Sequence, residues 1–178
     1  RAHEGASAAA RRGPRSGGIR VVGGVTAPGG PDDGADPVAI DETRLRALPS
    51  AAAELSGDVT AFDLRRAVDE TRERRDPVYW VDLEVPEGWV LIGDNGQGDE
   101  WWLGPRDDVW FFDHTNGERA PDRFTPMHLS VTEWVVVGHL LGAAEDVDEP
   151  DDAAIARLHA GLDAISPELS ERWPYDLG

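Results

Sequence analysis

The sequence contains no cysteine and no lysine, and the first of these absences excludes several classes of site. Without cysteine, the chain cannot form a disulfide framework, a thiolate zinc site, an iron–sulfur cluster or a cysteine nucleophile. Because lysine is missing, all 17 basic residues are arginine, which together with abundant alanine and glycine indicates the codon bias of a GC-rich genome. Long apolar runs are absent as well, so we expect neither a membrane-spanning segment nor a signal peptide.

Positive charge is scarce and unevenly placed. The 178 residues include 35 acids against 17 arginines, a net charge of −18. Such a surface repels phosphate, so we expect no binding to nucleic acid or to anionic lipid, and we expect a soluble, cytoplasmic protein. Residues 1–37 carry a net charge of about +1, and residues 38–178 therefore carry about −19.

Residues 1–37 are also rich in glycine and proline, with nine of the 20 Gly and four of the 13 Pro. That composition buries too little apolar surface to offset chain entropy, and it predicts a disordered tail or linker. The short apolar patch at residues 19–22 is the one part that could add to a sheet as an edge strand. Because the chain begins at Arg1 instead of Met, we expect a processed product or a piece of a longer polypeptide.

Helices are predicted on both sides of a central region. Asp41 can cap a helix carrying Leu45 and Leu48, and Pro49 either ends it or starts another helix through Leu55. Thr60 and Asp63 resemble a capping box for a helix closed by Pro77, with Ala61, Leu64, Val68 and Thr71 on one face. Towards the end of the sequence, Ser130 and Glu133 form a second capping box. That box opens a helix with Trp134, Val137 and Leu141 in register, ending at Gly142, and a last amphipathic helix carries Ile155, Leu158, Leu162 and Ile165.

Short segments rich in aromatic and β-branched residues fill the middle of the chain. They predict strands at residues 78–83, 88–93, 100–103 and 108–113, separated by turn sequences such as Asn95-Gly96. Connections of two to six residues require antiparallel pairing. The order helices, sheet, helices predicts an α+β fold: an antiparallel meander sheet of four or more strands with N-terminal and C-terminal helices packed around it.

Residues 89–103 read WVLIGDNGQGDEWWL, and residues 108–114 read DVWFFDH. Both segments resemble the SUKH superfamily, bacterial toxin-immunity proteins related to yeast regulators of cell-wall synthesis. Residues 129–141 resemble the family's closing helix, with Trp134 at its aromatic position, and Leu48-Pro49 resembles the Leu-Pro after its first helix. The resemblance implies a SUKH-like α+β domain over residues 38–145, and residues 146–178 form a C-terminal helical extension outside it.

Motifs for catalysis or for metal and cofactor binding are not found. The loop from Asp94 to Glu100 fails the EF-hand pattern, because Gly96 and Pro105 stand where Asp or Asn and Glu are needed. No GxGxxG, P-loop, HExxH or GxSxG motif occurs, and on a strand Asp113 and His114 would point apart. We therefore expect no enzyme, no metal site and no cofactor, although nothing in so acidic a chain excludes a carboxylate pair for glycoside hydrolysis.

Six of the seven Trp lie between Trp80 and Trp134, and the neighbours Trp101 and Trp102 must point to opposite faces of the sheet. One is expected in the core, and the other is covered by a helix, a terminal segment or a partner, for which an exposed Trp would be an apolar anchor. Acids predicted to project from the loop side of the sheet complete a candidate partner-binding set: Asp94, Asp99, Glu100, Trp101, Trp102, Asp107, Asp108 and Glu118.

The charge and the resemblance together predict an immunity protein. Toxins that attack nucleic acid have basic clefts, which an acidic inhibitor can occupy as a phosphate mimic after electrostatically steered association. We therefore expect a cognate protein toxin as the partner. The alternative is a scaffold or regulatory interaction domain of a larger polypeptide, and for most acidic proteins solubility alone explains the charge. A small enzyme, a further alternative, would require a pocket with convergent titratable groups.

Overall fold

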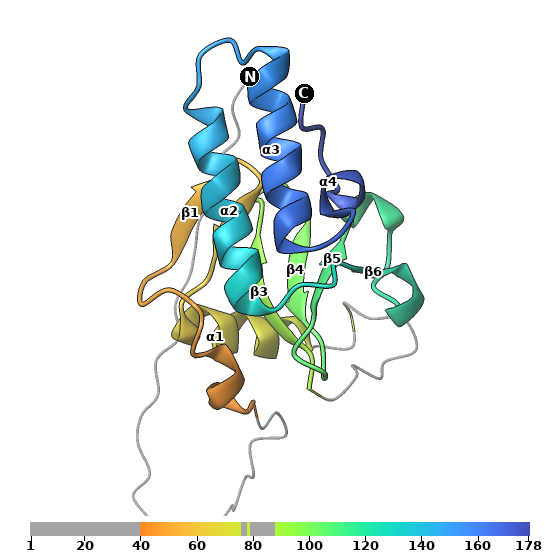
Figure 1. Ribbon diagram of the computed structural model, residues 1–178. Helices are drawn as coiled ribbons and strands as arrows, with labels where there is room; N and C mark the ends of the chain where they lie inside the picture. Colours follow the sequence, from red (N-terminus) through yellow and green to blue (C-terminus); the bar gives the residue numbers. More distant parts are fainter. Residues whose placement is uncertain (1–39, 76–77, 79–87) are drawn as a thin grey trace, which may run out of the picture. The chain divides into compact units, whose positions relative to one another are not determined.

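One antiparallel sheet with strands in chain order, β1-β2-β3-β4-β5-β6, forms the centre of the fold (Figure 1). The computed structural model describes residues 40–75, 78 and 88–178. Within them the strands are β1 (Ala53–Ser56), β2 (Val59–Ala61), β3 (Val90–Asp94), β4 (Glu100–Leu103), β5 (Val109–Phe112) and β6 (Thr125–Pro126). Every neighbouring pair is antiparallel. The predicted α+β fold with a meander sheet is confirmed.

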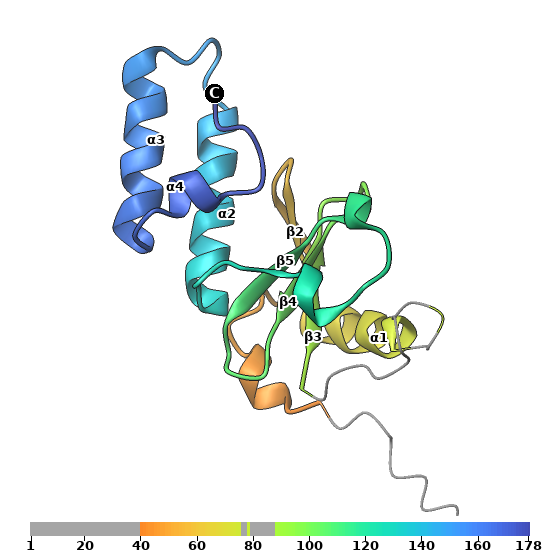
Figure 2. The same cartoon turned by 90° about the vertical axis from the view of Figure 1, so that its right-hand side faces the viewer.

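Helices cover both faces of this sheet. Helix α1 (Leu64–Arg74) packs on one face and α2 (Val131–Glu145) on the other, while α3 (Asp152–Ile165) lies along the outer side of α2 (Figures 1 and 2). The short α4 (Leu169–Arg172) follows α3, and the 3-10 turns are η1 (Glu42–Leu45), η4 (His114–Asn116) and η5 (Pro121–Arg123). Among the described residues, no helix is both long and apolar enough to cross a membrane.

The predicted helix starts are correct where a side chain caps the first turn. Ser130 and Glu133 form the expected capping box of α2, and Asp41 accepts a hydrogen bond from the Thr43 backbone at 3.0 Å. Gly142, however, does not end α2, which continues to Glu145. A Cβ on Gly142 would lie 2.1 Å from the Leu55 carbonyl oxygen, so this glycine permits close packing of the helix on β1.

Two predictions for the N-terminal half are wrong. Residues 53–56 form β1, so the alternative of a helix that starts at Pro49 and runs through Leu55 is wrong, and Thr60 lies in β2 instead of capping a helix. Asp63 is itself the N-cap of α1 and accepts from the Arg66 backbone at 2.8 Å. The Ala- and Ser-rich sequence has the local preference of a helix, but strand pairing decides its conformation.

The three predicted strands that fall within the described residues are present as β3, β4 and β5. The predicted strand at residues 78–83 lies outside those residues except for Val78, and so does the predicted tail at residues 1–37. Strand β1 contains no aromatic or β-branched residue, and β2 and β6 are only three and two residues long, so none of them stands out in the sequence.

The core lies on both sides of β4. Glu100 and Trp102 face α1, whereas Trp101 and Leu103 face α2, as the alternation of a strand requires. Both tryptophans are 0% exposed, so neither is available as an anchor for a partner. Trp101 stacks on Trp173 with ring centroids 5.0 Å apart, so a segment of the chain itself covers it.

Candidate functional site

The candidate partner-binding residues do not form one surface. Asp107 and Asp108 lie in the β4–β5 turn, at the opposite end of the sheet from the β3–β4 loop that contains Asp99, because successive turns of a meander alternate between its two ends. Asp107 pairs with the Arg44 guanidinium, and Asp94 lies 2.9 Å from that of Arg66. Glu118 is exposed.

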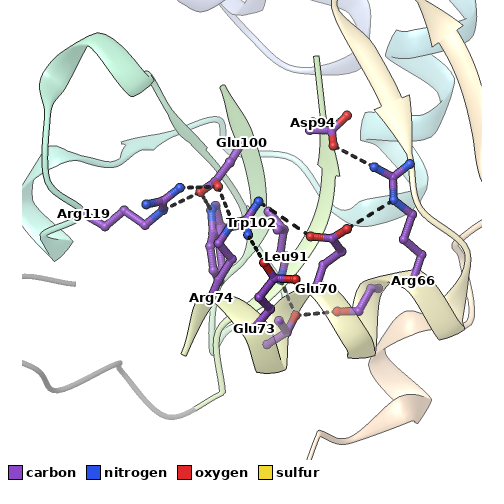
Figure 3. A network of polar contacts seen from close by, with 11 residues as sticks. Arg66, Glu70, Glu73, Arg74, Leu91, Asp94, Glu100, Trp102 and Arg119 are labelled. Carbon is purple, nitrogen blue, oxygen red and sulfur yellow. Dashed lines mark hydrogen bonds and ion pairs between the residues drawn. The ribbon is translucent and has the colours of Figure 1, made fainter. Parts of the chain in front are cut away.

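Four of those eight residues, Asp99, Glu100, Trp101 and Trp102, are buried, so their assignment to a binding surface is wrong. Figure 3 shows the side chains that surround Glu100, between β4 and α1. Its carboxylate accepts hydrogen bonds from Arg74 Nε at 3.1 Å, Arg119 Nε at 2.8 Å and Trp102 Nε1 at 3.0 Å. Two guanidinium groups and an indole thus satisfy this carboxylate, which ties α1 and residue 119 to β4.

Asp99, the residue directly before β4, has a similar internal role. Its carboxylate accepts from the His114 backbone at 3.0 Å, from Tyr175 Oη at 2.9 Å and from Asn95 Nδ2 at 2.8 Å, and His114 Nδ1 lies 2.6 Å away. Burial opposes its ionisation, but the hydrogen bonds from His114 and Tyr175 outweigh burial and hold the pKa of Asp99 below its usual range. We refer to Asn95, Asp99, His114 and Tyr175 as the Asp99 hub.

The structure differs from the expectation that Asp113 and His114 lie on a strand with their side chains pointing apart. Strand β5 ends at Phe112 and the 3-10 turn η4 begins at His114, so the alternation of a strand no longer separates their side chains. Side-chain ligand atoms of Asp99, Asp113 and His114 lie within 4.8 Å of one another, a donor set that metal ions can use. Protein donors already satisfy both Asp99 oxygens, and Asp113 caps η4 through the Thr115 backbone at 2.7 Å, so hydrogen bonding accounts for the cluster without an ion.

The Asp99 hub also fixes the course of residues 173–178. Tyr175 is held by Asp99 and Asn95, and Trp173 is stacked on Trp101. Burial first and the Asp99 carboxylate second raise the pKa of Tyr175 above its ordinary value of 10, so its phenol stays a neutral donor. Residues 176 and 177 are thereby placed beside α2 and α3 as one wall of a groove.

This groove is a largely apolar concave feature of the folded unit. It has a volume of about 390 Å³ and lies between the end of α2, the start of α3, and residues 176–177. Its apolar lining includes Leu140, Leu141, Val147, Ile155, Leu158 and Leu177. We call it the α2–α3 groove. Its size falls in the range of about 300–1,000 Å³ that is typical of ligand sites.

Carboxylates surround the α2–α3 groove. Asp58, Glu145 and Asp176 line it together with one base, Arg157, and six of the eight residues from 145 to 152 are acids. Glu145 accepts from the Gly57 backbone at 3.0 Å, which fixes the end of α2 against the β1–β2 turn. In the described part of the chain, no hydrogen bond or ion pair engages the Asp58 carboxylate. Burial first, and then the nearby charges of Glu145 and Asp99, raise the pKa of Asp58 above its usual range.

Another hollow, of about 690 Å³, lies between η1 and α1, but its charges are mixed. Arg46, Arg65 and Arg72 line it together with Glu42, Asp63 and Asp69. It therefore selects no sign of charge in a partner, unlike the α2–α3 groove.

The groove was not predicted from the sequence, although the sequence contains one indication of it. Leu140 and Val147 fall outside the stripe of Trp134, Val137 and Leu141 that α2 buries against the sheet, so the α2 region has apolar residues on a further face. Such a pattern indicates a second contact surface. In the structure this surface faces α3 and forms part of the groove lining.

No family model matches the chain, and no curated protein or solved structure shows significant similarity to it. What the chain binds is therefore inferred from its own chemistry.

Proposed function

We propose that this protein is a non-catalytic immunity protein, which binds a basic protein toxin that acts on nucleic acid and thereby neutralises it. The single observation that carries the proposal is the α2–α3 groove, an apolar concavity rimmed by carboxylates. The resemblance of residues 89–114 to the SUKH superfamily supports the same function.

The charge pattern suits an inhibitor of this kind. A protein that cleaves or modifies nucleic acid must present a basic cleft to the phosphates. A partner with a net charge of −18 is attracted to that cleft over about a Debye length, which raises the rate of association. Apolar contact in the centre of the interface then slows dissociation.

A non-catalytic role is supported by the way the polar clusters are used. The carboxylates of Asp99 and Glu100 converge with His, Tyr and Arg side chains, as catalytic groups do. Hydrogen bonds from within the chain satisfy each carboxylate. Neither Asp99 nor Glu100 lines a groove or hollow described above. They hold the fold together instead of facing a substrate.

Titration against the product of a toxin gene found next to this chain's own gene tests the proposal. We expect a Kd below about 1 μM at about 50 mM salt, at least tenfold weaker binding at about 500 mM salt, and loss of toxin activity at equimolar ratio. Kd values above about 1 μM at low salt, or an affinity indifferent to salt, would contradict it. Tight binding that leaves the toxin active would instead favour the scaffold or regulatory interaction domain.

A further inference from the structure

We propose that the α2–α3 groove is the docking site for one basic, amphipathic helix of a protein partner, with aliphatic side chains in the groove and arginine or lysine on its carboxylate rim. The proposal rests on the proposed function only in taking the partner to be a basic protein. It assigns the contact to one groove and names the kind of segment that fills it.

Most of the apolar lining of the groove comes from α2, α3 and the residues between them. Val147 is 46% exposed although it lies beside Leu140 and Leu158 in the groove lining. Aliphatic side chains spaced at i, i+3, i+4 and i+7 along a partner helix form a ridge that suits such a cleft between two helices. Burial of this ridge removes the remaining apolar surface of the groove from water.

Among the charged residues that line the groove, Asp58 gives the strongest reason to expect a cationic ligand. Its carboxylate is partly buried in the groove wall, engages no described hydrogen-bond or ion-pair partner, and is repelled by Glu145 and Asp99. The other charged groups lining the groove are Asp176 and Arg157, so the lining carries three acids and one base. A cationic side chain of the ligand would relieve the repulsion at Asp58 and satisfy a carboxylate that has no partner among the described residues.

The same charges argue against other occupants. A nucleic acid strand or an anionic lipid would be repelled by the six acids at residues 145–152. A second copy of this chain would bring another net charge of −18 to the contact. A basic segment, in contrast to these three occupants, is attracted by the acidic rim.

Two synthetic peptides of about 18 residues provide the probe. Both contain the same arginine and leucine residues, but the leucines lie on one helical face in the first peptide and around the helix in the second. Binding is measured by fluorescence anisotropy with the full chain. We expect the amphipathic peptide to bind at least tenfold more tightly, and equal affinity for both peptides would overturn the proposal, because charge alone would then explain binding.

A matched pair of variants locates the contact. Val147→Arg places a cation in the groove, whereas Val136→Arg places it on α2 outside the lining, at a position that is 50% exposed. Both changes alter the net charge equally and lie on the surface, so both should fold, which circular dichroism checks. We expect Val147→Arg to weaken binding of the amphipathic peptide at least tenfold and Val136→Arg less than twofold. Equal effects would overturn the assignment to the groove.

A second pair tests the rim. Asp58→Asn should weaken binding of the amphipathic peptide severalfold, and Asp122→Asn, which removes one charge from the exposed η5 turn, should have less effect. The reverse order would contradict the role of Asp58. Peptide binding without binding of the toxin would remove the proposed function and keep this site, whereas toxin binding unaffected by Val147→Arg would remove the site and keep the function.

Discussion

At the scale of single residues, the most consequential side chain is the buried Glu100. Its carboxylate is 4% exposed and receives Arg74, Arg119 and Trp102. We expect Glu100→Gln to lower the free energy of unfolding by about 2–4 kcal/mol, because two partly buried guanidinium groups lose the buried carboxylate that they share. Urea denaturation measures the change. Glu73→Gln is the control, since Glu73 is 64% exposed and its pair with Arg74 should contribute less than about 1 kcal/mol. Equal losses of unfolding free energy in the two variants would show that the burial of Glu100 does not determine how much its ion pairs contribute to stability.

The contribution of Asp99 to stability depends on pH. Because its pKa in the folded protein lies below the ordinary value of 3.8, the unfolded chain takes up the proton first as the pH falls. The stabilisation by Asp99 is therefore fully present above about pH 4 and is lost as the pH falls through the folded-state pKa. Asp99→Asn should cost about 1–3 kcal/mol at pH 7, and its difference from the parent chain should shrink towards pH 2.

Thermal or urea unfolding between pH 2 and 7 checks this behaviour, with Asp122→Asn as the control for the loss of one exposed acid. A difference between Asp99→Asn and the parent chain that stays constant over this range would mean that the carboxylate charge contributes nothing, and that only the shape of the side chain matters.

At the scale of elements, the packing of α2 on β1 depends on Gly142. A methyl group there would meet the Leu55 carbonyl oxygen at 2.1 Å, and backbone cannot move aside as a side chain can. We expect Gly142→Ala to destabilise the fold by about 1–3 kcal/mol in spite of the better helix propensity of alanine. In the control, Gly161→Ala on α3, the new methyl group meets the end of the flexible Leu140 side chain at 3.1 Å, so stability should change by less than about 1 kcal/mol. If both variants unfold at the same urea concentration, the contact between α2 and β1 is looser than the structure indicates.

The elements also show how far the sequence could predict the fold. The sheet centre was predictable because its strands concentrate Trp, Phe and Val between turn residues, and α2 was predictable because Ser130 and Glu133 cap it locally. Strand β1 was not, because its Ala, Glu and Ser favour a strand only once β2 and α2 lie beside it. The hydrogen bond between Tyr175 and Asp99 joins residues 76 positions apart, and no local pattern signals such a contact.

For the candidate site, the sequence predicted the sign of the charge but not its position. Part of that position follows from the predicted topology, because successive turns of an antiparallel meander lie at opposite ends of the sheet, so Asp94 and Asp108 could not share a loop side. The cover of Trp101 could not be predicted, since it comes from Trp173, far along the chain. The groove arises where α2, α3 and residues 176–177 meet, and such a meeting is a property of tertiary packing.

At the scale of the whole folded unit, the charge is polarised. Helix α1 carries four arginines against three acids, whereas residues 145–152 carry six acids and no arginine, and α1 lies on the sheet face opposite α2 (Figure 2). The excess of negative charge repels itself in the compact state, mainly around the α2–α3 groove, and salt screens this repulsion. Salt should therefore raise the free energy of unfolding and weaken the binding of a basic partner.

We expect the free energy of unfolding to rise by an amount on the order of 1 kcal/mol between about 50 mM and 500 mM sodium chloride, because the exposed acids are screened while the buried pairs of Glu100 are screened much less. Urea denaturation at the two salt concentrations measures it. The double variant Asp146→Asn/Asp148→Asn removes two exposed acids beside the groove and should show a smaller rise. A fall in stability with salt in the parent chain would mean that attraction, such as the pair of Arg66 with Asp94, outweighs repulsion among the acids. The acidic rim would then be balanced within the fold and would need no basic partner.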